Sequence, residues 1–528
     1  MRKISVPDLR AALTDGGELA LVDVREEGVF LQGHLFWAAC LPLSTLELRA
    51  PDLVPRRSAR IVLCDGGSED LADRSAAKLG EMGYTDVALL DGGTAAWAAA
   101  GGELFSGVNV PSKAFGEFVE HAYDTPRIAA DELKRRIDAG EDIVILDSWP
   151  WPEYHRMNIP GGIDVPGAEL VYRVHDLAPD PETTVVVNCA GRTRSIIGAQ
   201  SLINASLPNT VMALKDGTMG WELAGFDCET GAGRVGPPPS PEGLEKARAR
   251  AAQAAERFGV RFADPATIEG WAGDAERTLF VMDVRTPEEF EAGHLPGSRN
   301  APGGQLVQST DEYMATRNAR VILVDSERVR AVMTASWLIQ LGWPEVYVYA
   351  GDLGAAALET GVPVAPVPGL TEAPTIAAAA LANRLSEDGL AVLDLATSIQ
   401  YRGKHVPGAW WGVRARLAEA REAIGDAKTL VLSAPDDRLA HLAAPEAAAL
   451  WPGAEVLVLA GGTRAWDAAG QSVEQGVTRP TTETDDIWYK PYDHDGDQEK
   501  HMNAYLSWET ALVEQIARDG TVAFRKFG

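Results

Sequence analysis

LFVMDVRTPEEFEAGHLPGSRNAPG, at residues 279–303, joins a short apolar strand that ends in Asp283 to an acidic helical turn and a His-Leu-Pro-Gly turn. Three other stretches follow the same plan. A strand that ends in aspartate, followed by an aromatic residue and a turn, recurs at Asp23 and Phe30, at Asp147 and Tyr154, and at Asp394 and Tyr401. The copies lie more than 100 residues apart, which is the size of a domain and too long for a solenoid repeat.

Each copy continues in the same way, with a second apolar strand, an alanine-rich helical stretch, a third strand and a glycine-rich turn. The second strands read ARIVLCD, TVVVNCA, ARVILVD and TLVLSAP. Continuous apolar strands that alternate with amphipathic helices predict a parallel sheet with helices on both faces. The sequence therefore predicts an α/β fold of four tandem domains, each a mainly parallel sheet flanked by helices.

Proline-rich linkers place the boundaries of these domains. GPPPSPEG and VAPVPGLTEAP separate the second copy from the third and the third from the fourth. The predicted units are domains at residues 1–107, 120–235, 255–364 and 372–477, followed by a C-terminal tail with a helix at 478–528. In that tail, NAYLSWETALVEQIARD has apolar residues at helical spacing. We expect its Trp and Leu residues to dock on one of the domains.

The charge of the chain excludes several classes of partner. Acidic residues outnumber basic ones, 76 to 48, and the net charge is −28. Such a surface repels nucleic acid and anionic lipid, so we expect neither nucleic acid nor a membrane as a partner. The N-terminal segment lacks the apolar stretch of a signal peptide, and four cysteines in 528 residues form no disulfide scaffold. We expect a cytoplasmic protein.

The residue after the second strand is where chemistry is expected, because loops at the carboxyl ends of parallel strands line the ligand crevice. In the second copy this residue is Cys189. Alignment of the strands places Asp65, Asp325 and Ala434 at the same position in the first, third and fourth copies, and Cys64 falls one residue early. The sequence therefore predicts one active domain, the second, and three inactive ones.

The loop CAGRTRS, at residues 189–195, is suited to a reactive thiol. A thiolate is the nucleophile, and Arg192, Arg194 and a helix N-terminus are expected to lower the pKa of Cys189. Small residues let backbone N–H groups surround an anion. Ala190, Gly191 and Thr193 are predicted to bind substrate in this way, and Arg192 and Arg194 are predicted to bind and orient an anionic donor. We expect Ser195 to cap the helix that follows.

These motifs resemble those of the rhodanese family. DVRTPEEFEAGHLPGSRNAP resembles the rhodanese-domain signature, CAGRTRS resembles the active-site loop, and the final glycine-rich turn with its tryptophan resembles the C-terminal pattern. The resemblance covers nearly the whole chain except the tail. It implies a sulfurtransferase in which Cys189 takes sulfur from a small anionic donor such as thiosulfate, forms a persulfide and passes the sulfur to a thiol or cyanide. It implies no cofactor and no metal.

One position departs from the family pattern. Rhodaneses often carry an arginine two residues after the strand-ending aspartate, where it points at the donor. Arg25 and Arg285 stand there in the first and third copies, but the second copy has Trp149. We expect Trp149 to line the donor site and Arg156 to be a candidate replacement for the arginine. An aromatic donor pocket and a protein persulfide donor stay open as alternatives.

Two other functions compete with a sulfurtransferase. The first is a persulfide carrier or scaffold that delivers sulfur to a protein acceptor with little turnover of free donors. The second is a phosphatase or arsenate reductase, which also uses a Cys-Arg anion loop. The phosphatase loop is one residue longer, and the spacing from Cys189 to Arg194 fits the shorter, sulfur-handling loop.

The remaining polar and thiol residues have structural interpretations. We expect the recurring aspartates to fix loops through backbone hydrogen bonds, and the recurring histidines to make structural hydrogen bonds rather than bind metal. These residues are Asp23, Asp283, Asp394, His34, His294 and His405. Cys40 and Cys64 are expected in the core, and Cys228 is a candidate resolving thiol.

Overall fold

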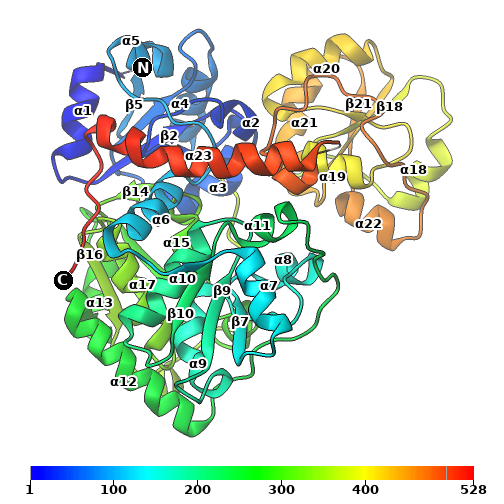
Figure 1. Ribbon diagram of the computed structural model, residues 1–528. Helices are drawn as coiled ribbons and strands as arrows, with labels where there is room; N and C mark the ends of the chain where they lie inside the picture. The colour runs from blue at the N-terminus through cyan, green and yellow to red at the C-terminus, as the bar shows by residue number, and fades with distance from the viewer. Residues whose placement is uncertain (1, 495) are drawn as a thin grey trace.

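The computed structural model describes residues 2–494 and 496–528, and four sheets with flanking helices account for most of them (Figure 1). The first sheet has the strand order β1-β5-β4-β2, with β3 beside β2. Its strands are β1 (Arg2–Ile4), β2 (Leu19–Asp23), β3 (Ala39–Cys40), β4 (Ile61–Cys64) and β5 (Val87–Leu90). Its helices are α1 (Val6–Thr14), α2 (Glu27–Phe30), α3 (Leu46–Leu53), α4 (Leu71–Glu81) and α5 (Gly93–Ala99).

The second sheet repeats this order as β6-β10-β9-β7-β8. Its strands are β6 (Arg127–Ile128), β7 (Ile143–Asp147), β8 (Ile163–Asp164), β9 (Thr184–Asn188) and β10 (Val211–Leu214). Its helices are α7 (Ala130–Asp138), α8 (Trp151–Arg156), α9 (Leu170–Leu177), α10 (Thr193–Asn204) and α11 (Gly217–Leu223), and α6 (Val110–Tyr123) precedes them.

The third and fourth sheets have the orders β11-β16-β15-β12-β13 and β17-β21-β20-β18-β19. The strands of the third are β11 (Arg261–Ala263), β12 (Leu279–Asp283), β13 (Arg299–Asn300), β15 (Arg320–Val324) and β16 (Glu345–Tyr349). The strands of the fourth are β17 (Thr375–Ile376), β18 (Leu390–Asp394), β19 (Trp410–Trp411), β20 (Thr429–Ser433) and β21 (Glu455–Leu459).

The helices of these two sheets follow the same sequence of elements. Those of the third are α13 (Pro265–Ala272), α14 (Pro287–Ala292), α15 (Gly303–Gln308), α16 (Thr310–Tyr313) and α17 (Val329–Gln340). Those of the fourth are α18 (Ala378–Arg384), α19 (Ser398–Gly403), α20 (Leu417–Ile424), α21 (Arg438–Leu450) and α22 (Gly462–Ala468). The predicted α/β fold, with four mainly parallel sheets flanked by helices, is confirmed.

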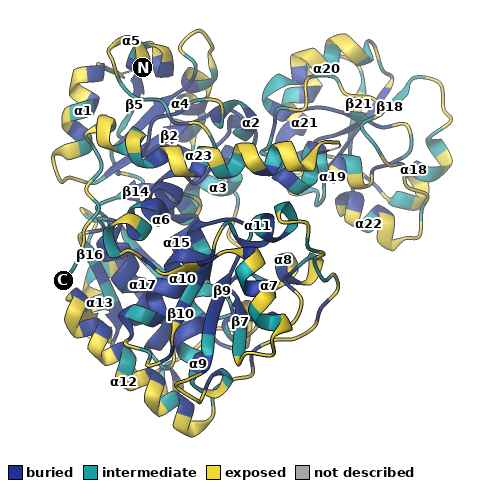
Figure 2. Cartoon of the chain, viewed as in Figure 1, coloured by how far each residue is buried: buried dark blue, intermediate teal, exposed yellow. Residues whose placement is uncertain are grey.

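The domains are tied together by shared elements. A strand between α16 and β15, β14 (Thr316–Arg317), leaves the third sheet and pairs antiparallel with β2 of the first. The helix α12 (Pro241–Phe258) packs between α9 of the second domain and α17 of the third. Their apolar faces form one continuous buried core, and Figure 2 shows the buried residues concentrated in the sheets and on the inner helix faces. The second and third domains therefore form one packed body.

The tail is also part of this body. The helix α23 (Gln498–Asp519), drawn in red in Figure 1, runs across the first domain and packs on α6. Leu512 is fully buried, and the Trp508 Nε1 donates to the Ser106 carbonyl at 2.8 Å. The predicted docking of the tail helix is confirmed. Within residues 2–494 and 496–528, no helix is long and apolar enough to cross a membrane.

Candidate active site

Cys189 lies at the end of β9, at the start of the loop that leads into α10. The backbone N–H of Ser195 donates to its Sγ at 3.3 Å, and Cys189 is 2% exposed. Gly217 closes over the loop with a φ of +57°, and a Cβ at this position would lie 2.2 Å from the Cys189 carbonyl oxygen. Only glycine fits here, because the backbone is left-handed and another backbone approaches closely. The thiol is therefore held in a rigid, enclosed loop.

Strand register places three other residues at the position of Cys189. Asp147 pairs with Asn188, the residue before Cys189. The corresponding pairs in the first, third and fourth sheets are Asp23–Cys64, Asp283–Val324 and Asp394–Ser433. The next residues along the chain are Asp65, Asp325 and Ala434. The second sheet alone has a thiol at this position.

The pKa of the Cys189 thiol is shifted in the opposite direction from the expected one. Burial raises the pKa of the Cys189 thiol above its ordinary value, and this effect exceeds the opposing ones of Arg194 and the Ser195 N–H. The expectation of a lowered pKa is therefore wrong for the resting protein, because desolvation penalises the thiolate more than the nearby cation stabilises it.

This raised pKa predicts the pH dependence of the thiol. Since the thiolate is the nucleophile, the rate of Cys189 alkylation by iodoacetamide should keep rising with pH above the range where a free cysteine levels off. Arg194→Gln should move the curve to still higher pH because it removes a charge that favours the thiolate. The rate, followed by intact mass from pH 6 to pH 10, checks this; a plateau below pH 8 would contradict it.

Ser195 does not cap the helix. The N-cap position of α10 is Arg192, and Ser195 is the third residue of the helix. Its hydroxyl donates to the Arg192 carbonyl at 2.8 Å instead of accepting from a free N–H. The predicted cap is wrong, because α10 begins earlier than the sequence pattern suggested. Ser195 contributes to the site through its backbone N–H.

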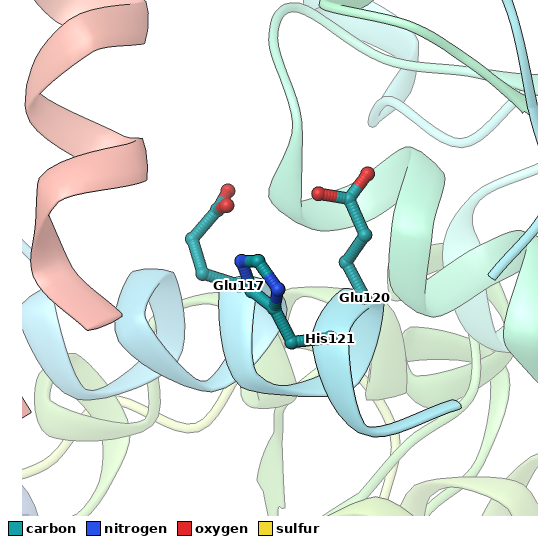
Figure 3. Close-up of side chains that lie close together, drawn as sticks. All are labelled: Glu117, Glu120 and His121. Atoms are coloured by element: carbon teal, nitrogen blue, oxygen red, sulfur yellow. The ribbon is translucent and has the colours of Figure 1, made fainter. Parts of the chain in front are cut away.

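Arg192 is occupied by carboxylates of the chain itself. Its guanidinium donates to Glu117 at 2.6 and 2.8 Å, to Asp216 at 3.0 Å and to Glu120. Figure 3 shows Glu117, Glu120 and His121 on α6, where their ligand atoms lie close enough to hold a metal ion. Both glutamates already serve as acceptors for Arg192, so we assign this group to anchoring the loop. These contacts leave Arg192 unavailable to a sulfur donor, so the donor-binding role predicted for it from the sequence is wrong.

Arg194 faces the thiol. Burial opposes its charge, but Glu153 and Cys189 raise its pKa above the ordinary arginine value. Its Nη2 donates to Glu153 at 2.9 Å, and its Nη1 donates to Gln305 of the third domain at 3.1 Å. The Lys490 Nζ, from the tail, donates to the same Glu153 at 2.7 Å. Two cations therefore share one carboxylate, so this group of three side chains carries a net positive charge beside Cys189, and Glu509 opposes it with a negative charge.

A cavity of about 410 Å³ opens in front of the thiol. The second domain contributes the Cys189 loop, and the first and third domains and the tail supply the other walls. Trp149 lies in the wall and is 4% exposed, and its indole Nε1 has no hydrogen-bond partner. The Tyr492 hydroxyl, in the wall formed by the tail, is also buried without a partner. Two neutral donors beside Cys189 are thus unsatisfied within the described residues.

The other predicted site residues have differing surroundings. Ala190, Gly191 and Thr193 line the cavity, and the Thr193 hydroxyl donates to Glu509 of α23 at 3.1 Å. Arg156 lies at the rim, with its side chain 57% exposed, and pairs with Asp493 at 3.0 Å. Sequence reasoning missed the residues that surround the loop from elsewhere in the chain. They are Glu153, Gln305, Lys490, Tyr492, Tyr505 and Glu509.

Three parts of the chain match one known family of domains. The model of the rhodanese-like domain matches residues 5–100, 129–224 and 267–357. This chain belongs to the rhodanese-like family. The fourth sheet lies outside those matches but has the same strand order.

Solved structures and curated proteins also resemble this chain. A thiosulfate sulfurtransferase from Pseudomonas aeruginosa is 49% identical over 100% of both chains, with a TM-score of 0.96. An HTH-type transcriptional regulator from Mycobacterium tuberculosis is 34% identical over 125 residues, which are 21% of this chain and 54% of that protein. A Bacillus subtilis protein of uncharacterized role is 38% identical over 75 residues, 14% of this chain and 58% of that protein. The chain thus spans little more than half of these two curated relatives but matches an enzyme over its full length.

In the third rhodanese-like domain, a buried arginine paired with carboxylates lies where the second domain has its thiol. Arg330 stands five residues after Asp325, as Arg194 stands five after Cys189. Arg330 is fully buried and donates to Asp325 at 2.8 Å and to Glu289 at 2.6 Å. A third carboxylate, Glu169 of the second domain, accepts at 2.9 Å. Carboxylates of the chain therefore fill the anion position in this domain.

The arginines that in the family pattern point at the sulfur donor are also paired with carboxylates of the chain. The Arg25 guanidinium donates to Asp23 at 2.6 and 2.9 Å, and Arg285 pairs with Asp283 in the same way. The same aspartates accept backbone N–H groups two residues on, at 3.1 Å, and Asp394 does so at 2.8 Å. Their expected structural role is confirmed. The histidines of these turns stack on Phe30, Phe290 and Tyr401 and hydrogen-bond to backbone carbonyls, as expected.

The other three thiols lie in apolar surroundings. Cys64 is buried, and Cys40 packs against the same core. Cys228 packs beside the Trp221 core, and burial raises the pKa of its thiol to about 12. A thiol with that pKa is a poor nucleophile near neutral pH, so this environment does not favour the resolving role that the sequence left open for Cys228.

Proposed function

We propose that this rhodanese-like protein is a sulfurtransferase that moves sulfane sulfur from thiosulfate or a related small anion to a thiol or cyanide through a persulfide of Cys189. The observation that carries the proposal is the enclosed cavity in which Cys189 faces the net positive charge around Arg194. The second domain, proposed to span residues 120–235, carries the reaction. We place the protein in the cytoplasm, since its chemistry needs a reduced thiol.

The reaction proceeds by two displacements. The Cys189 thiolate attacks the outer sulfur of thiosulfate, the sulfur–sulfur bond breaks, and sulfite leaves with the bonding electron pair. The outer sulfur is now bound to Sγ as a persulfide. A cyanide or thiolate acceptor then attacks this sulfur, and Cys189 leaves as a thiolate. No external oxidant or reductant is needed, and the enzyme returns to its starting state.

Arg194 is the proposed ligand for the charged oxygens of the donor. The third domain supports this assignment, because its equivalent Arg330 binds carboxylates at the position of the thiol. Guanidinium groups bind planar or tetrahedral oxyanions through paired N–H donors. In the second domain Cys189 stands where Asp325 does, so Arg194 pairs with Glu153 but has no carboxylate at that position, and we propose that a substrate oxyanion supplies it. Trp149 and Tyr492 would add two neutral donors in place of the arginine that the family pattern expects.

The Tyr492 hydroxyl gives a sensitive test of this arrangement. Tyr492→Phe should lower kcat/KM for thiosulfate about two- to tenfold, the size of one hydrogen bond. The midpoint of thermal unfolding should not fall, since the hydroxyl has no partner in the folded chain. The matched control is Tyr489→Phe. The Tyr489 hydroxyl donates to the Ser398 Oγ at 2.7 Å, and Tyr489 does not line this cavity. Equal kinetic losses in both variants would contradict the assignment.

One experiment separates the proposed enzyme from its competitors. The protein is incubated with thiosulfate, and intact mass and cyanide-dependent thiocyanate release are measured. A gain of one sulfur atom together with turnover supports the enzyme, whereas a gain without turnover favours the persulfide carrier. Release of phosphate from an aryl phosphate would favour the phosphatase. Failure to gain sulfur from thiosulfate or mercaptopyruvate would overturn the proposal.

A further inference from the structure

A second cavity, of about 500 Å³, lies where the first, third and fourth domains meet the tail. It adjoins the Cys189 cavity, with which it shares Glu27, Asn109 and Glu312 in its lining. One wall is formed by Ala434, Pro435 and Asp436, the start of the fourth-domain loop that is equivalent to the Cys189 loop. Ala434 offers no nucleophile there. The fourth domain thus has a pocket at the position of a rhodanese-like site but no thiol in it.

Besides Asp436, carboxyl groups from three other parts of the chain line this cavity. Glu26 and Glu27 belong to the first domain, Asp311 and Glu312 to the third, and Asp486 to the tail. Asp486 is 7% exposed. Its Oδ2 accepts the Ser398 N–H at 2.8 Å, but its Oδ1 has no hydrogen-bond partner within the described residues. A buried carboxylate oxygen without a donor is costly, and a donating ligand would remove that cost.

Four arginines also line the cavity. Arg414 is already paired with Glu47 and Glu446, and Arg438 with Asp436, which leaves Arg49 and the exposed Arg464 for the other five carboxyls. Burial raises the pKa of Glu26 to about 7, and burial together with the nearby Glu312 raises that of Glu27 to about 7. Burial, reinforced by Glu312, raises the pKa of Asp311 to about 7 as well. Groups in this state gain most from a cation that enters among them. These five carboxyls outnumber Arg49 and Arg464, so the cavity favours a ligand with positive charge.

The spacing of these carboxyls argues for an organic cation. A metal ion draws its ligands to within about 2.0–2.6 Å of itself. Within the described residues, the side chains that approach each other closely enough for this are Glu117, Glu120 and His121 on α6, which do not line this cavity. Carboxyls spread around a larger space suit a ligand whose N–H donors reach separate acceptors. Arg464, exposed at the edge of the cavity, could pair with a carboxylate if the ligand has one.

We propose that this cavity is a binding site for a small organic ammonium ion, with Asp486 as its main acceptor. The ammonium can belong to a basic amino acid or to a diamine, and Arg464 distinguishes the two. The site does not require Cys189, so it stands whether or not the proposed sulfur transfer is correct.

Isothermal titration calorimetry on the full chain tests the site with two probes, L-lysine and pentane-1,5-diamine. We expect saturable one-site binding of at least one probe, and Asp486→Asn should weaken it about tenfold or more, the loss of a charge-assisted hydrogen bond. Glu422→Gln, an exposed change on α20, is the matched control and should bind as the wild type does. Arg464→Gln should weaken L-lysine but not the diamine if the ligand is an amino acid.

Three results would overturn the proposal. These are no binding of either probe, unchanged binding to Asp486→Asn, and displacement of the probe by Mg²⁺ at equal concentration. Thermal unfolding of each variant shows whether it is folded. If Asp486→Asn does not fold, Glu26→Gln replaces it and should give the same loss. The titrations are repeated with Cys189→Ser, where unchanged binding separates this site from the sulfur chemistry.

Discussion

Cys189→Ser should abolish sulfur transfer, with a loss in kcat of about 10³-fold or more. A serine hydroxyl is a far weaker nucleophile toward sulfur, and the first, third and fourth domains have Asp65, Asp325 and Ala434 at the equivalent position. Intact mass after incubation with thiosulfate should show no added sulfur atom. Thiocyanate release from thiosulfate and cyanide should fall to the level without enzyme.

The control for this variant is Cys228→Ser. Cys228 lies beside the same domain core, and its thiol has a pKa of about 12. This variant should gain one sulfur atom and turn over as the wild type does. If Cys189→Ser still acquires sulfur, or if Cys228→Ser loses it, the single-thiol mechanism is wrong.

Arg194→Gln should lower kcat/KM for thiosulfate by about 10²–10³-fold, the usual cost of removing a charged ligand from a developing anion. The variant also leaves Glu153 paired with Lys490 alone, so the local charge falls from net positive to neutral. We expect the loss to appear in persulfide formation. The step from persulfide to cyanide should change less, since cyanide has no oxyanion to hold. Single-turnover mass measurements separate the two steps.

Arg285→Gln is the comparison for Arg194→Gln. Arg285 pairs with buried Asp283 and does not line the Cys189 cavity. Its loss leaves a buried carboxylate unpaired, so the free energy of unfolding should fall by about 3–5 kcal/mol. Persulfide formation by the folded protein should be nearly unchanged. Equal kinetic losses at both arginines would contradict a single site.

Much of the fold could be predicted from the sequence, because local patterns repeat. The apolar strands that end in aspartate predicted the parallel sheets. Alignment of the strands that follow them predicted the position of Cys189, because both patterns can be read along the chain. The identity of the loop arginines did not reveal their roles. Arg192 is bound by Glu117, which lies 75 residues earlier, whereas Arg194 faces the cavity.

The rest of the site depends on contacts that no local pattern encodes. Tyr492 and Lys490 reach the cavity from the tail, about 300 residues after Cys189. The aromatic and basic run WYKPY at residues 488–492 was the one local signal of their role. The pKa of Cys189 was misjudged for a related reason. Its burial results from walls that four separate parts of the chain supply, and the loop sequence shows only the charges.

The order of the walls along the chain has a consequence for biosynthesis. Cys189 leaves the ribosome before Tyr492 and Tyr505 have been made, and the intervening residues take about 15 to 60 s at ordinary elongation rates. During that interval the second domain can fold, but its thiol has no tail above it. The nascent protein is therefore most open to oxidation and stray alkylation before the tail is synthesised, and docking of the tail ends that vulnerable period.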